Sequence, residues 1–146
     1  MSWNLMLEVL IAAVGTIAFS ILFQVNPRHH FFCGLVGGIG WLVYRLVTEA
    51  SGSAILATFV ATLVLSACSR WFSTLRHTPT IVFLVCGIFT LVPGVPLTFA
   101  VRNFMENDYI AGLVRLTDAV LVAGCIAVGV GSVMIGWNTL LGGIVL

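Results

Sequence analysis

Few charged side chains stand where they could take part in chemistry, because most of this sequence is apolar. Arg115 and Asp118 are three residues apart in a long apolar stretch, so on a helix they share one face. A charge in such a stretch is costly unless it is paired or faces a cavity, so the pair is either a structural ion pair or a relay for a solute or a proton. Arg45 and Glu49 form either a structural ion pair or a relay in the same way. They lie nearer to a helix end, which favours the structural ion pair. The carboxylate of Glu8 lies close enough to a helix end to reach water.

The remaining reactive side chains predict neither catalysis nor metal binding. His29, His30 and His77 have no cysteine or carboxylate at ligand spacing beside them. The four cysteines show no C-x-x-C spacing and lie in apolar stretches, where they read as packing residues. Hydrolytic or transfer chemistry needs a carboxylate pair, a metal cluster or a nucleophile beside a base, and the sequence offers none of these. We expect no enzymatic activity, no cofactor, no metal and no nucleic-acid partner.

The backbone gives a stronger signal at Pro93-Gly94-Val95-Pro96, which interrupts an apolar stretch over residues 81–104. Proline has no backbone N–H, so each of the two prolines leaves a carbonyl group upstream without its helical partner. In hydrocarbon such groups must bond to protein, water or a ligand, and a broken helix is typical of the solute site of a transporter. A kink rescued by the hydroxyl of Thr90 or Thr98 is the structural alternative.

A helix that restarts after Pro96 would present free N–H groups and the positive end of its dipole, which suits a carboxylate. Arginine side chains further along could complement the same group. We therefore predict a solute path along this segment and the start of the last apolar stretch. The candidate residues are Thr90, Pro93, Gly94, Pro96, Thr98, Arg102, Asn103, Arg115 and Asp118.

Composition places these residues in a membrane. Hydrophobic residues make up 60% of the chain and charged residues 8%, against about 45–50% and about 25% in soluble domains. A helical crossing needs about 20 residues, so the 146 residues hold five crossings with short loops. The predicted fold is an all-α integral membrane protein, a single transmembrane domain over residues 1–146. Its crossings lie at about residues 5–23, 31–47, 53–72, 81–104 and 110–135, and the fourth is broken at the Pro-Gly segment.

Small residues at four-residue spacing predict where these helices pack. In the fifth crossing they are Ala119, Ala123, Ala127 and Gly131. Small residues let helices approach closely in lipid, either within one bundle, which is favoured here, or with another subunit.

Arginines near the ends of the crossings predict the orientation. When Arg115 is assigned to the fifth crossing, three arginines remain on one side of the membrane and two on the other. Because cytoplasmic loops carry the excess of positive residues, the N-terminus is expected outside and the C-terminus in the cytoplasm. The three are Arg28, Arg70 and Arg76, and the two are Arg45 and Arg102.

Several segments resemble the threonine/serine exporter family. Residues 89–97, with the sequence FTLVPGVPL, are similar to the Pro-Gly signature of that family. The segments Phe23-x-Val25-x-Pro27-Arg28 and Cys33-Gly34-Leu35-x-Gly37-x-Ile39-Gly40 resemble the start of its C-terminal module, and Ser69-Arg70-Trp71 fits too. The similarity covers residues 19–131. A proline before the Pro-Gly pair and an aromatic residue after it are both missing here, which leaves the identity of the solute open.

In length and content the chain resembles the small membrane subunit of the split, two-component form of this exporter. The resemblance implies a secondary transporter that exports threonine and serine, or a dicarboxylate such as succinate, across the inner membrane. Its partners would be the lipid bilayer, a small carboxylate solute and a second membrane subunit in a hetero-oligomer, with additional homo-oligomers left open. The alternative is a structural or assembly subunit with no solute site of its own.

Overall fold

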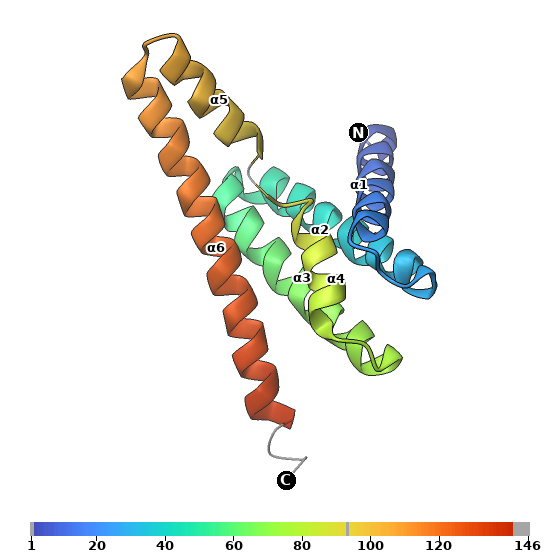
Figure 1. The fold of residues 1–146 in the computed structure, drawn as a ribbon. Helices are drawn as coiled ribbons and strands as arrows, with labels where there is room; N and C mark the ends of the chain where they lie inside the picture. The colour runs from blue at the N-terminus through green and yellow to red at the C-terminus, as the bar shows by residue number, and fades with distance from the viewer. Residues whose placement is uncertain (1, 93, 142–146) are drawn as a thin grey trace.

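The structure, a computed structural model, describes residues 2–92 and 94–141, and within those ranges it contains helices and turns but no strand. A short 3-10 turn, η1, at Pro27–His29 precedes the second helix. The α-helices in these ranges are α1 Ser2–Leu22, α2 His30–Ser51, α3 Ala54–Arg76, α4 Thr80–Ile88, α5 Gly94–Met105 and α6 Tyr109–Leu141 (Figure 1). The predicted all-α membrane fold is confirmed.

Four of the helices described here, α1, α2, α3 and α6, are long and apolar enough to cross a membrane. The fourth crossing is divided between α4, with nine residues, and α5, with twelve. At about 1.5 Å per residue each half falls well short of the hydrocarbon core, which is about 30 Å thick, whereas the two together match it. The fourth crossing is therefore broken, and residues 89–92 form the turn between its halves, just before the predicted Pro-Gly segment. The expected restart after Pro96 is wrong, because α5 already begins at Gly94 and contains Pro96 in its first turn, where a proline is tolerated.

Residues with a left-handed backbone end the helices. Gly52, with a φ of 67°, follows α2, and its N–H donates to the Thr48 carbonyl. His77, with a φ of 49°, ends α3 in the same way. Asn107, with a φ of 62°, turns the chain between α5 and α6. Because these connections are short, consecutive helices pack directly on one another.

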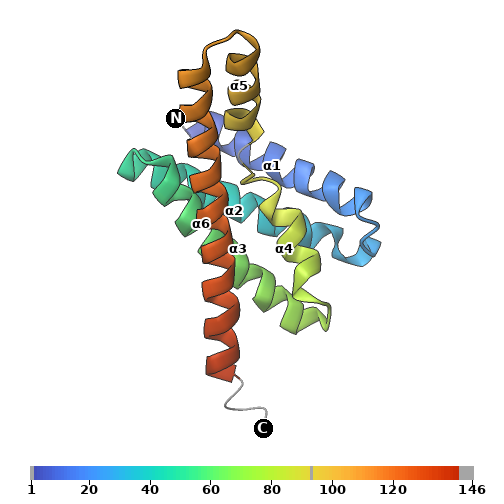
Figure 2. The same ribbon diagram turned by 60° about the vertical axis from the view of Figure 1, so that its left-hand side comes forward.

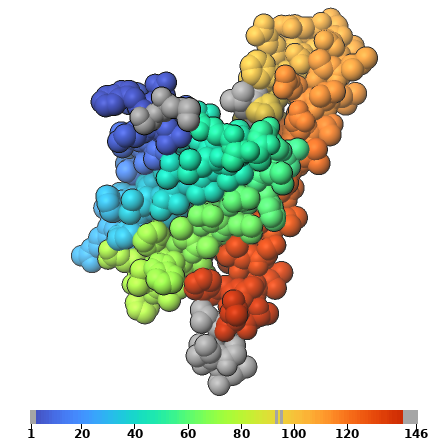
Figure 3. Space-filling view, turned by 180° about the vertical axis from the view of Figure 1, so that it is seen from behind, coloured from blue at the N-terminus to red at the C-terminus, as the bar shows by residue number. Residues whose placement is uncertain are grey.

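The helices form a block and a projecting hairpin. α1 packs on α2, α2 on α3, and α3 on both α4 and α6. α5 packs chiefly on α6, and in both ribbon views the joined ends of α5 and α6 extend beyond the other helices, while the rest of α6 runs along α3 (Figures 1 and 2). Seen from behind, the hairpin projects beyond the block formed by α1, α2 and α3 (Figure 3). The break in the fourth crossing lies where the hairpin leaves the block.

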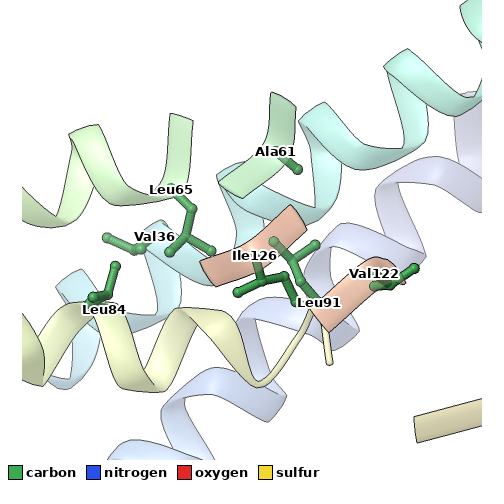
Figure 4. Packing of buried hydrophobic residues seen from close by; sticks show 7 residues of the cluster. All are labelled: Val36, Ala61, Leu65, Leu84, Leu91, Val122 and Ile126. Atoms are coloured by element: carbon green, nitrogen blue, oxygen red, sulfur yellow. The ribbon is translucent and has the colours of Figure 1, made fainter. Parts of the chain in front are cut away.

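The apolar core lies between α2, α3, α4, α6 and the break. Leu91 of the break is only 6% exposed, so its side chain anchors the turn in the core. Gly87 allows α4 to approach closely, since a Cβ there would lie 3.0 Å from Val36 and 3.1 Å from Leu65. The buried core residues are Val36, Ala61, Leu65, Leu84, Leu91, Val122 and Ile126 (Figure 4).

The small residues of α6 point both inward and outward. Gly129 packs on Thr62 of α3, where an added Cβ would lie 3.0 Å from the threonine side chain. Ala119 is buried as well. Ala123 and Ala127, however, are exposed, so the expectation that favoured packing within the bundle is wrong for these two residues. They lie on a face of α6 that a helix of another subunit could approach.

Candidate functional site

The turn between α4 and α5 is fixed by its own hydrogen bonds. The N–H of Thr90 donates to the Gly87 carbonyl at 3.2 Å, and the Thr90 hydroxyl donates to the same carbonyl at 2.7 Å. The N–H of Gly94 donates to the Val92 carbonyl at 2.7 Å. The Thr90 hydroxyl thus adds a second bond to a carbonyl that already accepts the Thr90 N–H, and it does not supply the rescue suggested for a carbonyl that a proline leaves without a helical partner. The break is a defined turn.

The restart of the helix explains the position of Pro96. It lies in the first turn of α5, where the N–H groups have no partner within the helix, so its missing N–H costs no helical hydrogen bond. The Thr98 hydroxyl donates to the Gly94 carbonyl at 2.8 Å, so it bonds its own helix and does not bridge the break. A Cβ on Gly94 would meet open space. Pro93, another predicted residue, lies outside the described residues.

A pocket of about 290 Å³ lies beside the break. Thr90 of the turn and Pro96 of α5 line it. Trp41 and Tyr44 of α2 and Thr58 of α3 contribute to the same wall, and α6 completes it. Threonine and tyrosine side chains, an indole ring and apolar surface therefore meet at one place, an arrangement that can orient a small polar solute.

A second pocket, of about 250 Å³, adjoins the first at Pro96. Asn103 of α5 and Arg115 of α6 line it together with Pro96 and Phe99. The structure therefore brings four of the predicted residues, Thr90, Pro96, Asn103 and Arg115, to two pockets that share Pro96 in their lining.

The other predicted side chains lie away from these pockets. Thr98 and Arg102 line a separate pocket of about 380 Å³ on another face of α5. Arg102 is largely exposed, and its Nε lies 2.9 Å from Glu106 Oε1. Asp118 is half-buried on α6, and no ion pair of 4.0 Å or less joins it to Arg115 in the described ranges. The shared helix face of these two residues does not produce a pair.

Comparison with known proteins assigns the chain to a family. The sequence model of the family described as Threonine/Serine exporter, ThrE matches residues 8–135. This chain belongs to the threonine/serine exporter family. The match includes both halves of the broken crossing, and it confirms the resemblance predicted from the Pro-Gly segment.

One curated relative of this exporter-family chain is an uncharacterized protein of Haemophilus influenzae (strain ATCC 51907 / DSM 11121 / KW20 / Rd). It is 26% identical over 92 residues, which cover 63% of this chain and 31% of the relative. The chain thus spans about a third of the length of that relative. No solved structure matches the chain.

The match to the exporter family begins at Glu8, a residue that the sequence did not mark as part of a site. Glu8, Trp41 and Thr90 line a third cavity, of about 270 Å³, between α1, α2 and the break. Glu8 Oε2 lies 2.8 Å from Arg45 Nε and accepts a hydrogen bond from Trp41 Nε1 at 3.4 Å. Glu8 thus pairs across the interface of α1 and α2. The sequence signal that could have identified Glu8 is its position as an acidic residue within an apolar stretch. A carboxylate in such a stretch usually has a charged partner or faces a cavity.

Polar groups also collect along α3 in this exporter-family chain. Arg70 donates to the Thr80 hydroxyl and to Asn138 Oδ1, both at 3.2 Å, and so links α3 with α4 and α6. Ser66 and Ser69 are fully buried, and their hydroxyls have no hydrogen-bond partner in the part of the chain that the structure describes. In the same ranges no three histidine, cysteine or acidic side chains are grouped to hold a metal ion.

Proposed function

We propose that this chain is one membrane module of a secondary exporter of small polar carboxylate metabolites, and that the solute passes the break between α4 and α5. The observation that carries the proposal is the pocket at the break, where Thr90 and Pro96 meet polar groups of α2 and α3. Irregular backbone at membrane depth is tolerated where it is buried or lines a cavity, and secondary transporters build solute sites from broken helices. Membership of the threonine/serine exporter family supports the same function.

The start of α5 suits a solute that carries a carboxylate. A helix N-terminus has about half a positive charge and N–H groups without helical partners. Pro96, in the first turn of α5, lines the pocket, so this end of the helix lies beside the solute. The hydroxyls of Tyr44, Thr58 and Thr90 complete the polar contacts. Threonine, serine or a dicarboxylate such as succinate fits these groups.

The buried hydroxyls of α3 mark the route away from the pocket. Thr58 lines the pocket, and Thr62, Ser66 and Ser69 follow it along the helix, all with 2% exposure or less. The hydroxyls of Thr58 and Thr62 donate to carbonyls of α3, whereas those of Ser66 and Ser69 have no partner between described residues. Hydroxyl oxygens can accept hydrogen bonds from a polar solute and so replace part of its hydration in hydrocarbon. The route ends near Arg70. We place this end at the cytoplasmic face of a bacterial inner membrane, with the N-terminus of the chain outside and the C-terminus inside.

A second membrane subunit completes the exporter in this proposal. α5 packs chiefly on α6, and many large apolar side chains of the hairpin are exposed. The exposed Ala123 and Ala127 of α6 allow close approach of a further helix. The chain also spans only about a third of its curated relative. A partner with five similar crossings would enter the membrane in the opposite direction, which is the inverted arrangement common in secondary transporters.

Metabolite release from cells that express this chain with and without its partner tests the proposal. We expect export of threonine, serine or succinate when both subunits are present. Tyr44→Phe and Thr58→Val each remove one hydroxyl from the pocket, and each is expected to lower export about tenfold. Thr117→Val is the control, because the Thr117 hydroxyl donates to the Leu113 carbonyl on an exposed part of α6. If the pocket variants export as well as the control, the solute does not use this pocket.

A structural or assembly subunit is the second candidate function. It is favoured by Thr98 and Arg102, whose polar groups bond within α5 and its following turn. In this case the partner alone binds the solute, and substitutions at Thr90 leave selectivity unchanged. Solute binding to the purified partner, measured with and without this chain, separates the two functions.

A further inference from the structure

The cavity between α1, α2 and the break has one charged end and one aromatic end. Along α1 it is lined by one helical face that includes Glu8, Gly15 and Phe19. From Glu8 to Phe19 the helix rises by about 16 Å, at about 1.5 Å per residue. Phe19 stacks on Phe89 of the break with a centroid distance of 4.7 Å, which closes that end. The carboxylate of Glu8 lies at the other end.

Helix α2 positions the Glu8 carboxylate. Arg45 Nε and Trp41 Nε1 both contact Glu8 Oε2, at 2.8 Å and 3.4 Å. Arg45 Nη2 is also 3.9 Å from Glu49 Oε1. Two carboxylates therefore share one guanidinium, and the cluster keeps one negative charge. Between described residues no hydrogen bond is made to Glu8 Oε1, and about a third of the Glu8 side chain is exposed.

The groups around Glu8 are complementary to a protonated amine. A surplus negative charge in apolar surroundings is costly until a positive group neutralises it. The indole ring of Trp41 lines the same cavity, and aromatic rings attract cations. The Thr90 hydroxyl adds a hydrogen-bond acceptor. A second carboxylate on a solute would instead face the charge of Glu8 and be repelled.

We propose that Glu8 is the specificity-determining residue of the solute path. Its carboxylate, positioned by Arg45 and Trp41, binds the amino group of a zwitterionic solute and disfavours a dianion. This inference rests on the proposed function, and it chooses between the two solute classes that the proposed function leaves open. Trp41 and Thr90 line both this cavity and the pocket at the break, so a solute bound at Glu8 lies next to the polar groups of that pocket.

Export of threonine and of succinate by the chain together with its partner provides the test. Glu8→Gln keeps the size of the side chain and removes its charge. It is expected to lower the ratio of threonine export to succinate export by about tenfold or more. Glu106→Gln is the matched control, because Glu106 also contacts an arginine Nε, that of Arg102 at 2.9 Å, but lies in the exposed turn after α5. The control is expected to keep the wild-type ratio.

Two further variants keep the test decisive if Glu8→Gln does not fold. Glu8→Gln with Arg45→Gln removes both members of the pair and leaves Glu49, which is exposed, as the one charge of the cluster. This double variant is expected to insert into the membrane and to show the same lowered ratio. Glu8→Asp keeps the charge and is expected to keep the preference for threonine.

The outcomes separate this inference from the proposed function. An unchanged ratio in Glu8→Gln or in the double variant overturns the role of Glu8 and leaves the proposed exporter in place. A wild-type complex that prefers succinate to threonine also overturns the role of Glu8 and leaves the proposed exporter in place. A wild-type complex that exports neither solute overturns the proposed function, and the role of Glu8 with it.

Discussion

Replacing Thr90 by valine removes one hydroxyl from the break with little change in the shape of the side chain. In the structure this hydroxyl donates to the Gly87 carbonyl at 2.7 Å, and Thr90 lines two cavities beside Trp41. Loss of such a hydrogen bond is expected to lower the free energy of unfolding by about 1 kcal/mol. Loss of a hydrogen bond from the same hydroxyl to the solute adds a cost of similar size, which lowers export about fivefold at low solute concentration.

Thr48→Val is the matched control for this prediction. The Thr48 hydroxyl donates to the Tyr44 carbonyl, also at 2.7 Å, and Thr48 is half-buried like Thr90 but contacts neither cavity. Thermal unfolding of the detergent-solubilised complex is expected to show a similar small loss of stability for both variants. Export of a radiolabelled solute from cells should fall for Thr90→Val alone. Equal export by the two variants would refute the reasoning that the hydroxyl at the break meets the solute.

Two more predictions concern packing and assembly. Gly87→Val forces a side chain onto Val36 and Leu65, which would lie 3.0 Å and 3.1 Å from its Cβ. It is expected to lower the free energy of unfolding by about 1–3 kcal/mol, seen as a lower thermal-unfolding midpoint. An unchanged midpoint would contradict the packing around Gly87. Ala127→Trp, on the exposed face of α6, is expected to leave membrane insertion intact and to abolish co-purification with the partner, whereas Leu140→Trp, exposed near the end of α6, is expected to retain it. Recovery of the complex with Ala127→Trp would show that the partner binds elsewhere.

The broken crossing could be predicted from the sequence because its cause is local. A proline stops a helix through its own backbone, and Pro96 is tolerated because it falls in the first turn of a new helix. The long crossings follow from the length of the apolar stretches in the same way. Neither result depends on which helices are neighbours.

The site could be predicted only in part, since its side chains meet through packing. Glu8 and Arg45 are far apart in the sequence, and they pair only because α1 and α2 pack in a particular register. Helical spacing places Arg115 and Asp118 on one face, but it does not give the neighbours of either side chain. Arg102 illustrates the same limit, because it contacts Glu106 in the turn after α5 and lines neither of the two pockets that share Pro96.

Protection of a cysteine at the break is the most direct test of the claim that the solute passes there. In the complex of this chain with its partner, Thr90→Cys is expected to react with a water-soluble methanethiosulfonate reagent, and saturating solute is expected to slow that reaction. Thr48→Cys is expected to react at a rate that the solute does not change, once labelling of the native cysteines is subtracted. A reaction at Thr90→Cys that saturating solute leaves unchanged would contradict the proposed path.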